Sequence, residues 1–337
     1  MFKKMMFLML TAILAIGVAA GAGEKIPTFG VVIFDYANDY CFHVRTGMIK
    51  AAEGIAKLEL VDSQNDQAKQ NDQVDTLINK GVDGMLVAIV DPEAAPTIID
   101  KCRDADIPVV FVNRRPELDV IASYDKCWYV GAATAQPGEA QAEMVIEDWK
   151  NHPEFDKNKD GVLQYIICKG ENGHANAEAR CQGIERVFEA AGFKRQLLDM
   201  QVGMWNAAMG RQLMETWYGK FGDEIEAVLS NNDAMALGII EALKGEGYFT
   251  GDKFMPIYGV NAIPEGLDAL EEGTLMGTVM SDMISEGACT FRLAYNHVMD
   301  KDLMEGVDYD MDANKCVAIL GIPIRKENIE EARAMYR

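Results

Sequence analysis

The amino-acid sequence predicts an α/β protein with two doubly wound parallel sheets, and three observations lead to this fold class. Apolar, β-branched runs of strand length alternate with segments in which apolar residues recur every three or four positions, as they do in helices. The strand runs are apolar on both faces, which is typical of parallel sheets covered by helices on both sides. The chain of 337 residues, 49% of them hydrophobic, is long enough for two such domains.

The alternation runs through the whole chain after the first 25 or so residues. It begins with the strand run TFGVVIF at 28–34 and the helical spacing at 43–58. It continues through ELVDSQ, QNDQVDTLINKG, DGMLVAIV, APTIIDKCRDAD and IPVVFVN. Beyond residue 130 it continues through GEAQAEMVIEDWKN, LQYIICKG, AEARCQGIERVFEAAG, KRQLLDM, AAMGRQLMETWYGKFG, EAVLSNND, AMALGIIEALKGEG, MPIYGVN, PEGLDALEEG and MGTVM.

The first residues have the pattern of a secretory signal. Lys3 and Lys4 precede an apolar run at 5–20, and small residues then allow cleavage after about Ala20 or Ala22. The interpretation is a signal peptide over 1–22 and an exported mature protein. The alternative is an uncleaved membrane anchor, although the apolar run is short and interrupted by glycine.

Charge and cysteine content exclude several classes of protein. Thirty-two Lys and Arg against 53 Asp and Glu give a net charge of -21, so a nucleic-acid partner is not expected. The chain has no C-x-x-C motif, so no zinc ribbon or redox motif is indicated. We expect buried free thiols, with one or two disulfides as the alternative, among Cys41, Cys102, Cys127, Cys168, Cys181, Cys289 and Cys316.

Polar, amide-rich segments follow most of the predicted strands. In a doubly wound sheet the ligand binds at the carboxyl ends of the strands, so these segments are the expected site. They are DYANDY, DSQND, VDPE, KGENGHANAEAR, MQVGMWN, SNND and GVNAIPEG, together with Asn113. None has the G-x-G-x-x-G or G-K-[ST] spacing that binds nucleotide phosphates.

The segment DKNKDGVLQ at 156–164 has the spacing of a calcium-binding loop. It places oxygen ligands at loop positions 1, 3, 5, 7 and 9, namely Asp156, Asn158, Asp160, the carbonyl of Val162, and Gln164. Gly161 stands at the sharp turn, but position 12, which is a glutamate in an EF-hand, is Ile167. A further carboxylate must therefore come from elsewhere, and the alternative is a polar turn that binds no ion.

Several of these segments, together with DSQNDQAKQNDQVDTLINKGVDG, MWNAA, NNDAMALG and GVNAIPEGLDAL, carry a resemblance to a known family. In order and over nearly the whole mature chain, the sequence resembles the periplasmic D-galactose/D-glucose-binding proteins, type I substrate-binding proteins of ABC sugar importers. The resemblance implies a periplasmic, monomeric protein whose partners are a sugar, an importer permease and a chemoreceptor.

The resemblance also implies an arrangement of domains and a calcium ligand set. Two lobes joined by a three-crossing hinge would comprise 24–131 with 282–318 (lobe one) and 132–281 with 319–337 (lobe two). Glu226 would be the remote ligand of a structural Ca²⁺, completing the loop set. Because a strand follows the loop, the ion would stabilise lobe two.

The family's sugar-binding positions fall on ten residues of this chain. They are Asn38, Tyr40, Asn113, His174, Asn176, Arg180, Trp205, Asn232, Asn261 and Ser281. Tyr40 and Trp205 would stack on the sugar's C–H faces, and the others would hydrogen-bond its hydroxyls. The match is uneven, because three asparagines replace family aspartates and a serine replaces an asparagine. These replacements are Asn38, Asn176, Asn261 and Ser281.

The missing aspartates leave two classes of ligand open. Asparagine still donates and accepts, so a neutral monosaccharide like glucose or galactose is the principal expectation. The alternative is an acidic sugar such as a hexuronate, because Arg180 has no acidic partner among the matched positions and an unpaired buried guanidinium is costly. Asp39 could also turn inward and restore one carboxylate, whereas we expect Glu178 to face solvent.

Two other classes of protein are weighed against a sugar-binding protein. A hydrolase is not expected, because no serine elbow, H-E-x-x-H motif or pair of cleft carboxylates is present and the family catalyses no reaction. A sugar-responsive repressor would need an N-terminal helix-turn-helix, where this chain has an export signal.

Overall fold

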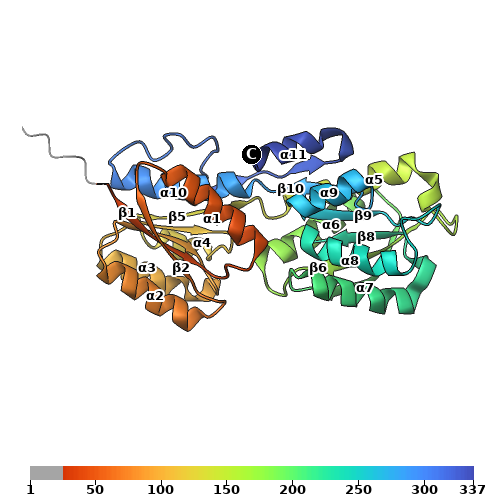
Figure 1. Ribbon diagram of the computed structural model, residues 1–337, viewed down its shortest axis with the longest axis horizontal. Helices are drawn as coiled ribbons and strands as arrows, with labels where there is room; N and C mark the ends of the chain where they lie inside the picture. The colour runs from red at the N-terminus through yellow and green to blue at the C-terminus, as the bar shows by residue number, and fades with distance from the viewer. Residues whose placement is uncertain (1–25) are drawn as a thin grey trace, which may run out of the picture.

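The computed structural model describes residues 26–337, and the predicted signal peptide and its cleavage point lie outside them. The chain forms two α/β lobes placed end to end (Figure 1). Each lobe has a six-stranded sheet with helices on both faces, which confirms the predicted fold class.

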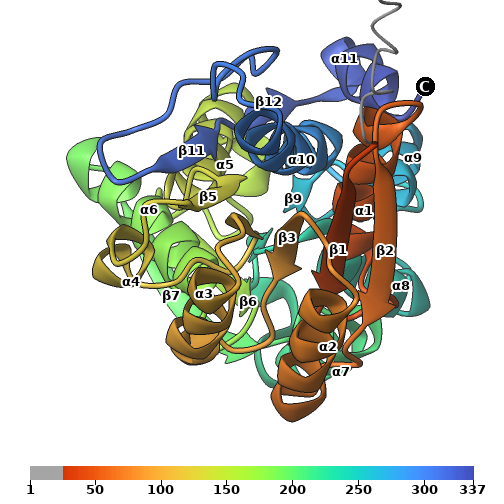
Figure 2. The ribbon, with the colours of Figure 1, turned by 90° about the vertical axis from the view of Figure 1, so that its left-hand side faces the viewer.

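Lobe one contains a fully parallel sheet of order β11-β5-β4-β3-β1-β2. Its strands are β1 (Thr28–Ile33), β2 (Lys57–Asp62), β3 (Gly84–Ala88), β4 (Val109–Val112), β5 (Cys127–Ala132) and β11 (Cys316–Ile319). Its helices are α1 (Asp39–Ala52), α2 (Gln67–Asn79), α3 (Ala95–Asp104), α4 (Leu118–Ala122) and α10 (Met283–Val298). Helices α1 and α10 pack together on one face of the sheet, and α2 and α3 cover the other (Figure 2).

Lobe two contains a sheet of order β12-β10-β9-β8-β6-β7. Its strands are β6 (Leu163–Lys169), β7 (Arg195–Val202), β8 (Ala227–Ser230), β9 (Ile257–Asn261), β10 (Gly277–Met280) and β12 (Ile322–Ile324). Its helices are α5 (Gln136–Asn151), α6 (Ala175–Ala190), α7 (Ala207–Phe221), α8 (Asp233–Gly245), α9 (Pro264–Glu272) and α11 (Ile329–Met335).

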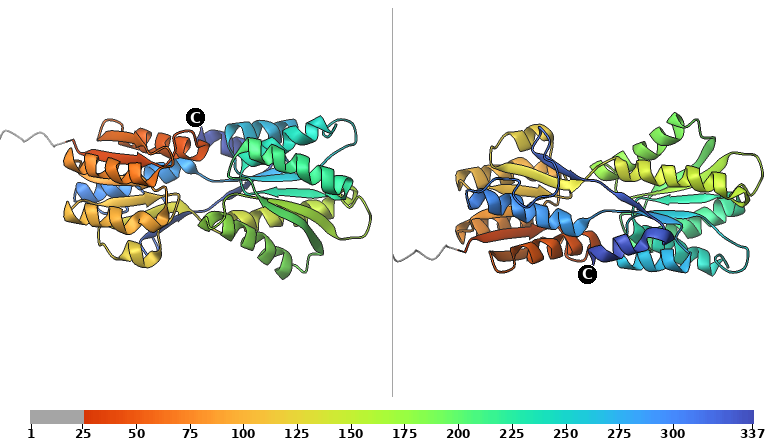
Figure 3. Two further views of the ribbon diagram at one scale, coloured as in Figure 1. Left: turned by 90° about the horizontal axis from the view of Figure 1, so that it is seen from below. Right: turned by 90° about the horizontal axis from the view of Figure 1, so that it is seen from above.

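One strand departs from the predicted parallel pattern, because β12 pairs antiparallel with β10. Strand β11 ends at Ile319 and the chain continues across the hinge into β12 after only two residues (Figure 3). It therefore enters the second sheet at the carboxyl edge and runs against the other strands.

Both faces of each sheet are buried in an apolar core. In β1, Val31 and Ile33 belong to the core under α1 and α10, whereas Val32 belongs to the core under α2 and α3. Lobe two has the same two-sided arrangement, with separate clusters around Ile166 and Ile167 of β6. This explains why the strand runs are apolar at consecutive positions.

The chain passes between the two sheets three times, at 133–135, 281–282 and 320–321. Ala132 and Ile319, which the predicted division assigns to lobe two, are the last residues of strands in the first sheet. Two crossings are tied together, because the side-chain amide of Gln136 donates to the Gly321 carbonyl at 2.9 Å and accepts from its N–H at 2.8 Å.

All seven cysteines are buried free thiols, as the principal expectation had it. Within residues 26–337, no helix combines the length and apolar character needed to cross a membrane.

Candidate functional site

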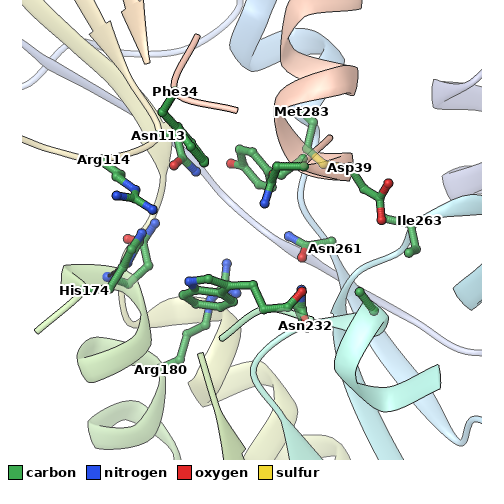
Figure 4. Close-up of a pocket in the computed structure, with 15 residues that line it drawn as sticks. Phe34, Asp39, Asn113, Arg114, His174, Arg180, Asn232, Asn261, Ile263 and Met283 are labelled. Carbon is green, nitrogen blue, oxygen red and sulfur yellow. Dashed lines mark hydrogen bonds between the residues drawn. The ribbon is translucent and has the colours of Figure 1, made fainter. Parts of the chain in front are cut away.

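A cavity lies between the lobes, where the carboxyl ends of both sheets meet (Figure 4). Every predicted ligand-binding residue except Ser281 lines it. The further lining residues are Phe34, Asp39, Arg114, Ala234, Ile263 and Met283. The structure therefore brings together residues far apart in sequence, including Asp39, which had been weighed as a replacement carboxylate.

Three of the polar lining residues begin helices that point at the cavity. Asn38 Oδ1 accepts the Cys41 N–H at 3.1 Å at the start of α1, and Asn232 Oδ1 accepts the Met235 N–H at 3.0 Å at the start of α8. His174 Nδ1 likewise accepts the Asn176 N–H at 3.2 Å at the start of α6. Capping uses the one lone pair of His174 Nδ1 and one of the two lone pairs on each asparagine oxygen, and Asn232 Nδ2 also donates to the Trp205 carbonyl at 3.3 Å. The remaining N–H groups of these side chains are therefore the donors that they offer a ligand.

Acceptor atoms come from other asparagines. Asn176 is 5% exposed, and its side-chain amide makes no hydrogen bond with any described residue. Asn261 donates through Nδ2 to Ser281 Oγ at 3.2 Å, which leaves its Oδ1 available. Ser281 is thus a supporting residue behind the cavity wall in this structure. The cavity offers both donors and acceptors, as a sugar hydroxyl requires.

The two aromatic rings have different surroundings. Trp205 lies in the left-handed backbone region with φ of 58°, and its ring packs on Gly170, where a Cβ would lie 2.2 Å from the ring. The His174 ring meets it edge-on, with centroids 5.1 Å apart. Tyr40 is held by its hydroxyl, which donates to Glu286 Oε1 at 2.5 Å.

His174 is a neutral imidazole in this environment. Burial lowers its pKa to about 3, and the charges of Arg114 and Arg180 act in the same direction. Since Nδ1 accepts a backbone hydrogen bond, the proton of the neutral ring is on Nε2. His174 can therefore donate to a ligand but does not act as an acid at neutral pH.

Arg180 is buried in the cavity wall, with 4% of its surface exposed. Its Nη1 donates to the Asn231 carbonyl at 2.5 Å, while Nε has no hydrogen-bond partner among the described residues. Burial lowers the pKa of the guanidinium, and the nearby Tyr40, Glu286 and Asp233 oppose that shift. Arg180 thus has acidic neighbours that the sequence did not reveal, although none of them pairs with it directly.

Arg114 is a cavity residue that the sequence did not single out. Its guanidinium lies over the Phe34 ring at 4.4 Å from the centroid and donates to the Val90 carbonyl. Its Nη2 also reaches Glu171 Oε2 of lobe two at 3.4 Å. Its position directly after Asn113, at the end of a strand run, could have identified it.

Glu178 lies outside the cavity lining with its side chain 40% exposed, as expected, but it also makes specific contacts. Its Oε1 pairs with Lys169 Nζ at 2.6 Å and accepts the Gly173 N–H at 3.0 Å. The pair holds the loop before α6 against the end of β6, and so supports His174.

The predicted calcium loop forms a tight turn whose ligands bond to one another. Asp156 accepts the N–H groups of Asp160 and Gly161 at 3.1 and 3.0 Å, and Gly161 has φ of 72°. The amides of Asn158 and Gln164 donate to Asp160 Oδ2 at 3.0 and 2.9 Å. Over residues 26–337, no group of three or more His, Cys, Asp and Glu side chains is arranged to hold a metal ion.

Glu226 nevertheless lies against this loop, although it is distant in sequence. Its carboxylate is buried and accepts the N–H groups of Lys157 and Gln164 at 2.8 and 3.0 Å. The side-chain atoms that could coordinate an ion at the loop are all oxygens, which suits a hard cation such as Ca²⁺. Binding would require the amides of Asn158 and Gln164 to turn their oxygens toward the ion.

Comparison with known proteins identifies one protein family. The model of the periplasmic binding protein domain family matches residues 29–302. The D-galactose/methyl-galactoside binding periplasmic protein of Haemophilus influenzae is 37% identical over 319 residues, covering 94% of this chain and 95% of that protein. A putative rhizopine-binding protein of Rhizobium meliloti is 29% identical, covering 81% and 85% of the two chains.

Solved structures agree with the fold. An ABC transporter solute-binding protein from Bacillus halodurans with bound myo-inositol is 28% identical, with a TM-score of 0.75 and coverage of 92% of this chain and 98% of that one. A periplasmic solute-binding protein from Actinobacillus succinogenes with bound D-allose is 18% identical, with a TM-score of 0.77 and coverage of 90% and 99%.

Proposed function

Since this chain belongs to the periplasmic binding protein domain family, we propose that it is the exported substrate-binding protein of an ABC sugar importer. The ligand is a monosaccharide like glucose or galactose, held in the cavity between the lobes. One observation carries the proposal: donors, acceptors and the aromatic rings of Phe34, Tyr40 and Trp205 surround one cavity between the lobes. The protein binds its ligand without transforming it.

The hydrogen-bonding roles of the cavity side chains also match a hexose. Capping leaves donors on Asn38, His174 and Asn232, whereas Asn176 and Asn261 keep acceptors. A ring hydroxyl both donates and accepts, so a neutral sugar would satisfy both kinds of group. The ring of Trp205 supplies an apolar surface on which the C–H face of a sugar can stack.

Calorimetry with glucose, galactose, glucuronate and galacturonate tests the proposal. We expect saturable one-to-one binding of a neutral hexose, with a change in tryptophan fluorescence and an unaltered sugar recovered afterwards. Trp205→Ala should weaken binding at least tenfold, because a stacking surface is lost. Failure of all four sugars to bind, or recovery of a converted sugar, would contradict the proposal.

An acidic sugar is the second candidate ligand. Two arginines line the cavity against one aspartate, and the Nε atoms of both Arg114 and Arg180 lack partners among the described residues. A carboxylate bound at Arg180 would give this buried cation an anion. Tight binding of a uronate with weak binding of the neutral hexoses would select this candidate.

We further propose that the loop at 156–164 and Glu226 bind a structural Ca²⁺. Two observations support the proposal: the candidate coordinating atoms are all oxygens, and the buried Glu226 lies beside the loop. The ligands would be Asp156, Asn158, Asp160, the carbonyl of Val162, Gln164 and Glu226, and the ion would neutralise their carboxylates and stabilise lobe two.

Melting the protein with excess Ca²⁺ and with a chelator tests this site. We expect Ca²⁺ to stabilise the fold by about 2–3 kcal/mol when it is present at 100 times its dissociation constant. Asp160→Asn should remove most of the effect, whereas Glu154→Gln, an exposed residue just before the loop, should not. A melting temperature unchanged by chelation and by added Ca²⁺ would refute the proposal.

The partners and the location are part of the same proposal. We propose that the protein is periplasmic and monomeric, and that its protein partners are an importer permease and a chemoreceptor. Light scattering after size-exclusion chromatography tests the monomer. Loss of sugar uptake and of the swimming response in a deletion strain tests the two partners separately.

A further inference from the structure

A buried carboxyl group stands behind the lobe-one wall of the cavity. Glu286 lies in the first turn of α10 and has no exposed surface. Its Oε1 accepts the hydroxyl of the cavity residue Tyr40 at 2.5 Å, and its Oε2 has no hydrogen-bond partner among the described residues. A buried carboxyl oxygen without a partner costs free energy unless a charge or a proton compensates it.

A positive charge that acts on Glu286 comes from the other lobe and lines the same cavity as Tyr40. Arg180 of α6 is buried, has an unpartnered Nε, and interacts electrostatically with Glu286 and Tyr40. The second acidic neighbour of Arg180 is already committed to the fold, because Asp233 accepts Thr278 Oγ1 at 2.7 Å and the Ile263 N–H at 3.1 Å. Glu286 is therefore the acidic neighbour with a free oxygen.

We propose that Glu286 determines whether this cavity accepts an acidic sugar in addition to a neutral one. When Glu286 is ionised, it is a counter-charge for Arg180 across the cleft, and a sugar carboxylate is repelled while a neutral sugar still binds. When Glu286 is protonated, Arg180 lacks this counter-charge, and the cavity binds a sugar carboxylate as well. This inference rests on the proposed function and names the residue that separates its two candidate ligands.

The groups around Glu286 place its pKa within the pH range of a binding experiment. Burial raises its pKa to about 8 and the charge of Asp282 raises it further, while the Tyr40 hydrogen bond, the charge of Arg180 and the backbone N–H of Ala132 lower it. Tyr129 of β5 and Cys289 of α10 are the other titratable groups that it influences.

The proton balance fixes the sign of the pH dependence. A bound sugar carboxylate beside Arg180 repels an ionised Glu286, so uronate binding at high pH requires the uptake of one proton. Uronate affinity should therefore fall by about tenfold per pH unit above about pH 8 and level off below it. The affinity for a neutral hexose should change little over the same range.

Dissociation constants for galactose and galacturonate, measured by calorimetry on the full mature chain from about pH 6 to pH 9, test the inference. Glu286→Gln keeps an acceptor for Tyr40 but removes the charge. We expect it to bind galacturonate independently of pH and to raise the galacturonate-to-galactose affinity ratio at least tenfold at the highest pH. The exposed Glu241→Gln on α8, which only removes a pair with Lys244, should behave as wild type.

Tyr40→Phe separates the charge from the hydrogen bond. It leaves the Glu286 carboxyl in place without the bond that lowers its pKa, so the fall in uronate affinity should move to higher pH and persist. A Glu286→Gln ratio and pH profile within threefold of wild type, with galactose still bound, would overturn the inference and leave the proposed function intact. If wild type bound neither sugar at any pH, the proposed function itself would fail, and the inference with it.

Discussion

At the scale of single residues, the cavity side chains also stabilise the fold. Asn38, His174 and Asn232 cap helices and present donors to the cavity, so a substitution at any of them affects both stability and binding. The polar segments after the strands located these residues, and the family resemblance then singled them out. The sequence could not predict Glu286, which lies inside a helix and reaches Tyr40 only through packing of α1 against α10.

The neutral state of His174 predicts a pH dependence of stability. The folded-state pKa of about 3 lies below the ordinary value of 6.5, so between these values the unfolded chain binds the additional proton. His174 therefore destabilises the fold as the pH falls from 6.5 toward 3, by at most about 1.4 kcal/mol per pH unit.

Urea unfolding of wild type and His174→Asn, which keeps a capping side chain, measures this contribution. We expect the stability of the variant to fall less steeply over the acidic range and to equal that of wild type within about 1 kcal/mol at pH 8. Equal slopes for the two proteins would contradict a neutral, buried His174. In spectra of the native protein, the His174 ring resonances should not titrate near pH 6.5.

At the scale of elements, helix contacts set the position of the binding residues. Glycines permit the close approach of α5 to α6, since a Cβ at Gly138 would lie 2.1 Å from the Arg180 carbonyl oxygen and one at Gly183 would lie 2.7 Å from that of Ala135. The sequence predicted both helices from apolar spacing, but it could not show that these glycines face a neighbouring backbone. That information requires the packed pair.

We expect Gly138→Ala to displace α6 and with it Arg180. The overlap with backbone cannot be relieved by a side-chain rotation, so the variant should lose about 1–3 kcal/mol of stability and bind sugar at least tenfold more weakly. Gly219→Ala is the matched control, because its Cβ would meet no atom within 4 Å on α7, and it should gain about 0.5–1 kcal/mol with unchanged affinity. Chemical unfolding and calorimetry give both quantities, and equal behaviour of the two variants would exclude the packing explanation.

At the scale of the whole molecule, two lobes and three short crossings create the site between them. The alternating elements and the length predicted two sheets, and the strand ends predicted most residues of the cleft. The antiparallel β12 could not be predicted, because its direction follows from the path of the chain across the hinge. The relation between the lobes also depends on contacts that no local pattern encodes, such as the Arg114–Glu171 pair.

This pair predicts how charge contributes to closure of the cleft. Arg114 follows β4 in lobe one, Glu171 follows β6 in lobe two, and their nitrogen and oxygen atoms are 3.4 Å apart with side chains 13% and 32% exposed. The contact exists only when the lobes approach, so it favours the closed form by about 0.5–1 kcal/mol at low ionic strength.

Glu171→Gln should therefore weaken sugar binding about two- to fivefold and remove part of the salt dependence of the affinity. Glu215→Gln removes an ion pair with Arg211 inside lobe two and should change neither quantity. Calorimetry at low and high salt distinguishes these outcomes, and small-angle scattering should show a larger mean radius of gyration for unliganded Glu171→Gln than for wild type. If both variants bound sugar as wild type does at every salt concentration, the ion pair would have no part in closure, and the hinge and the ligand alone would determine it.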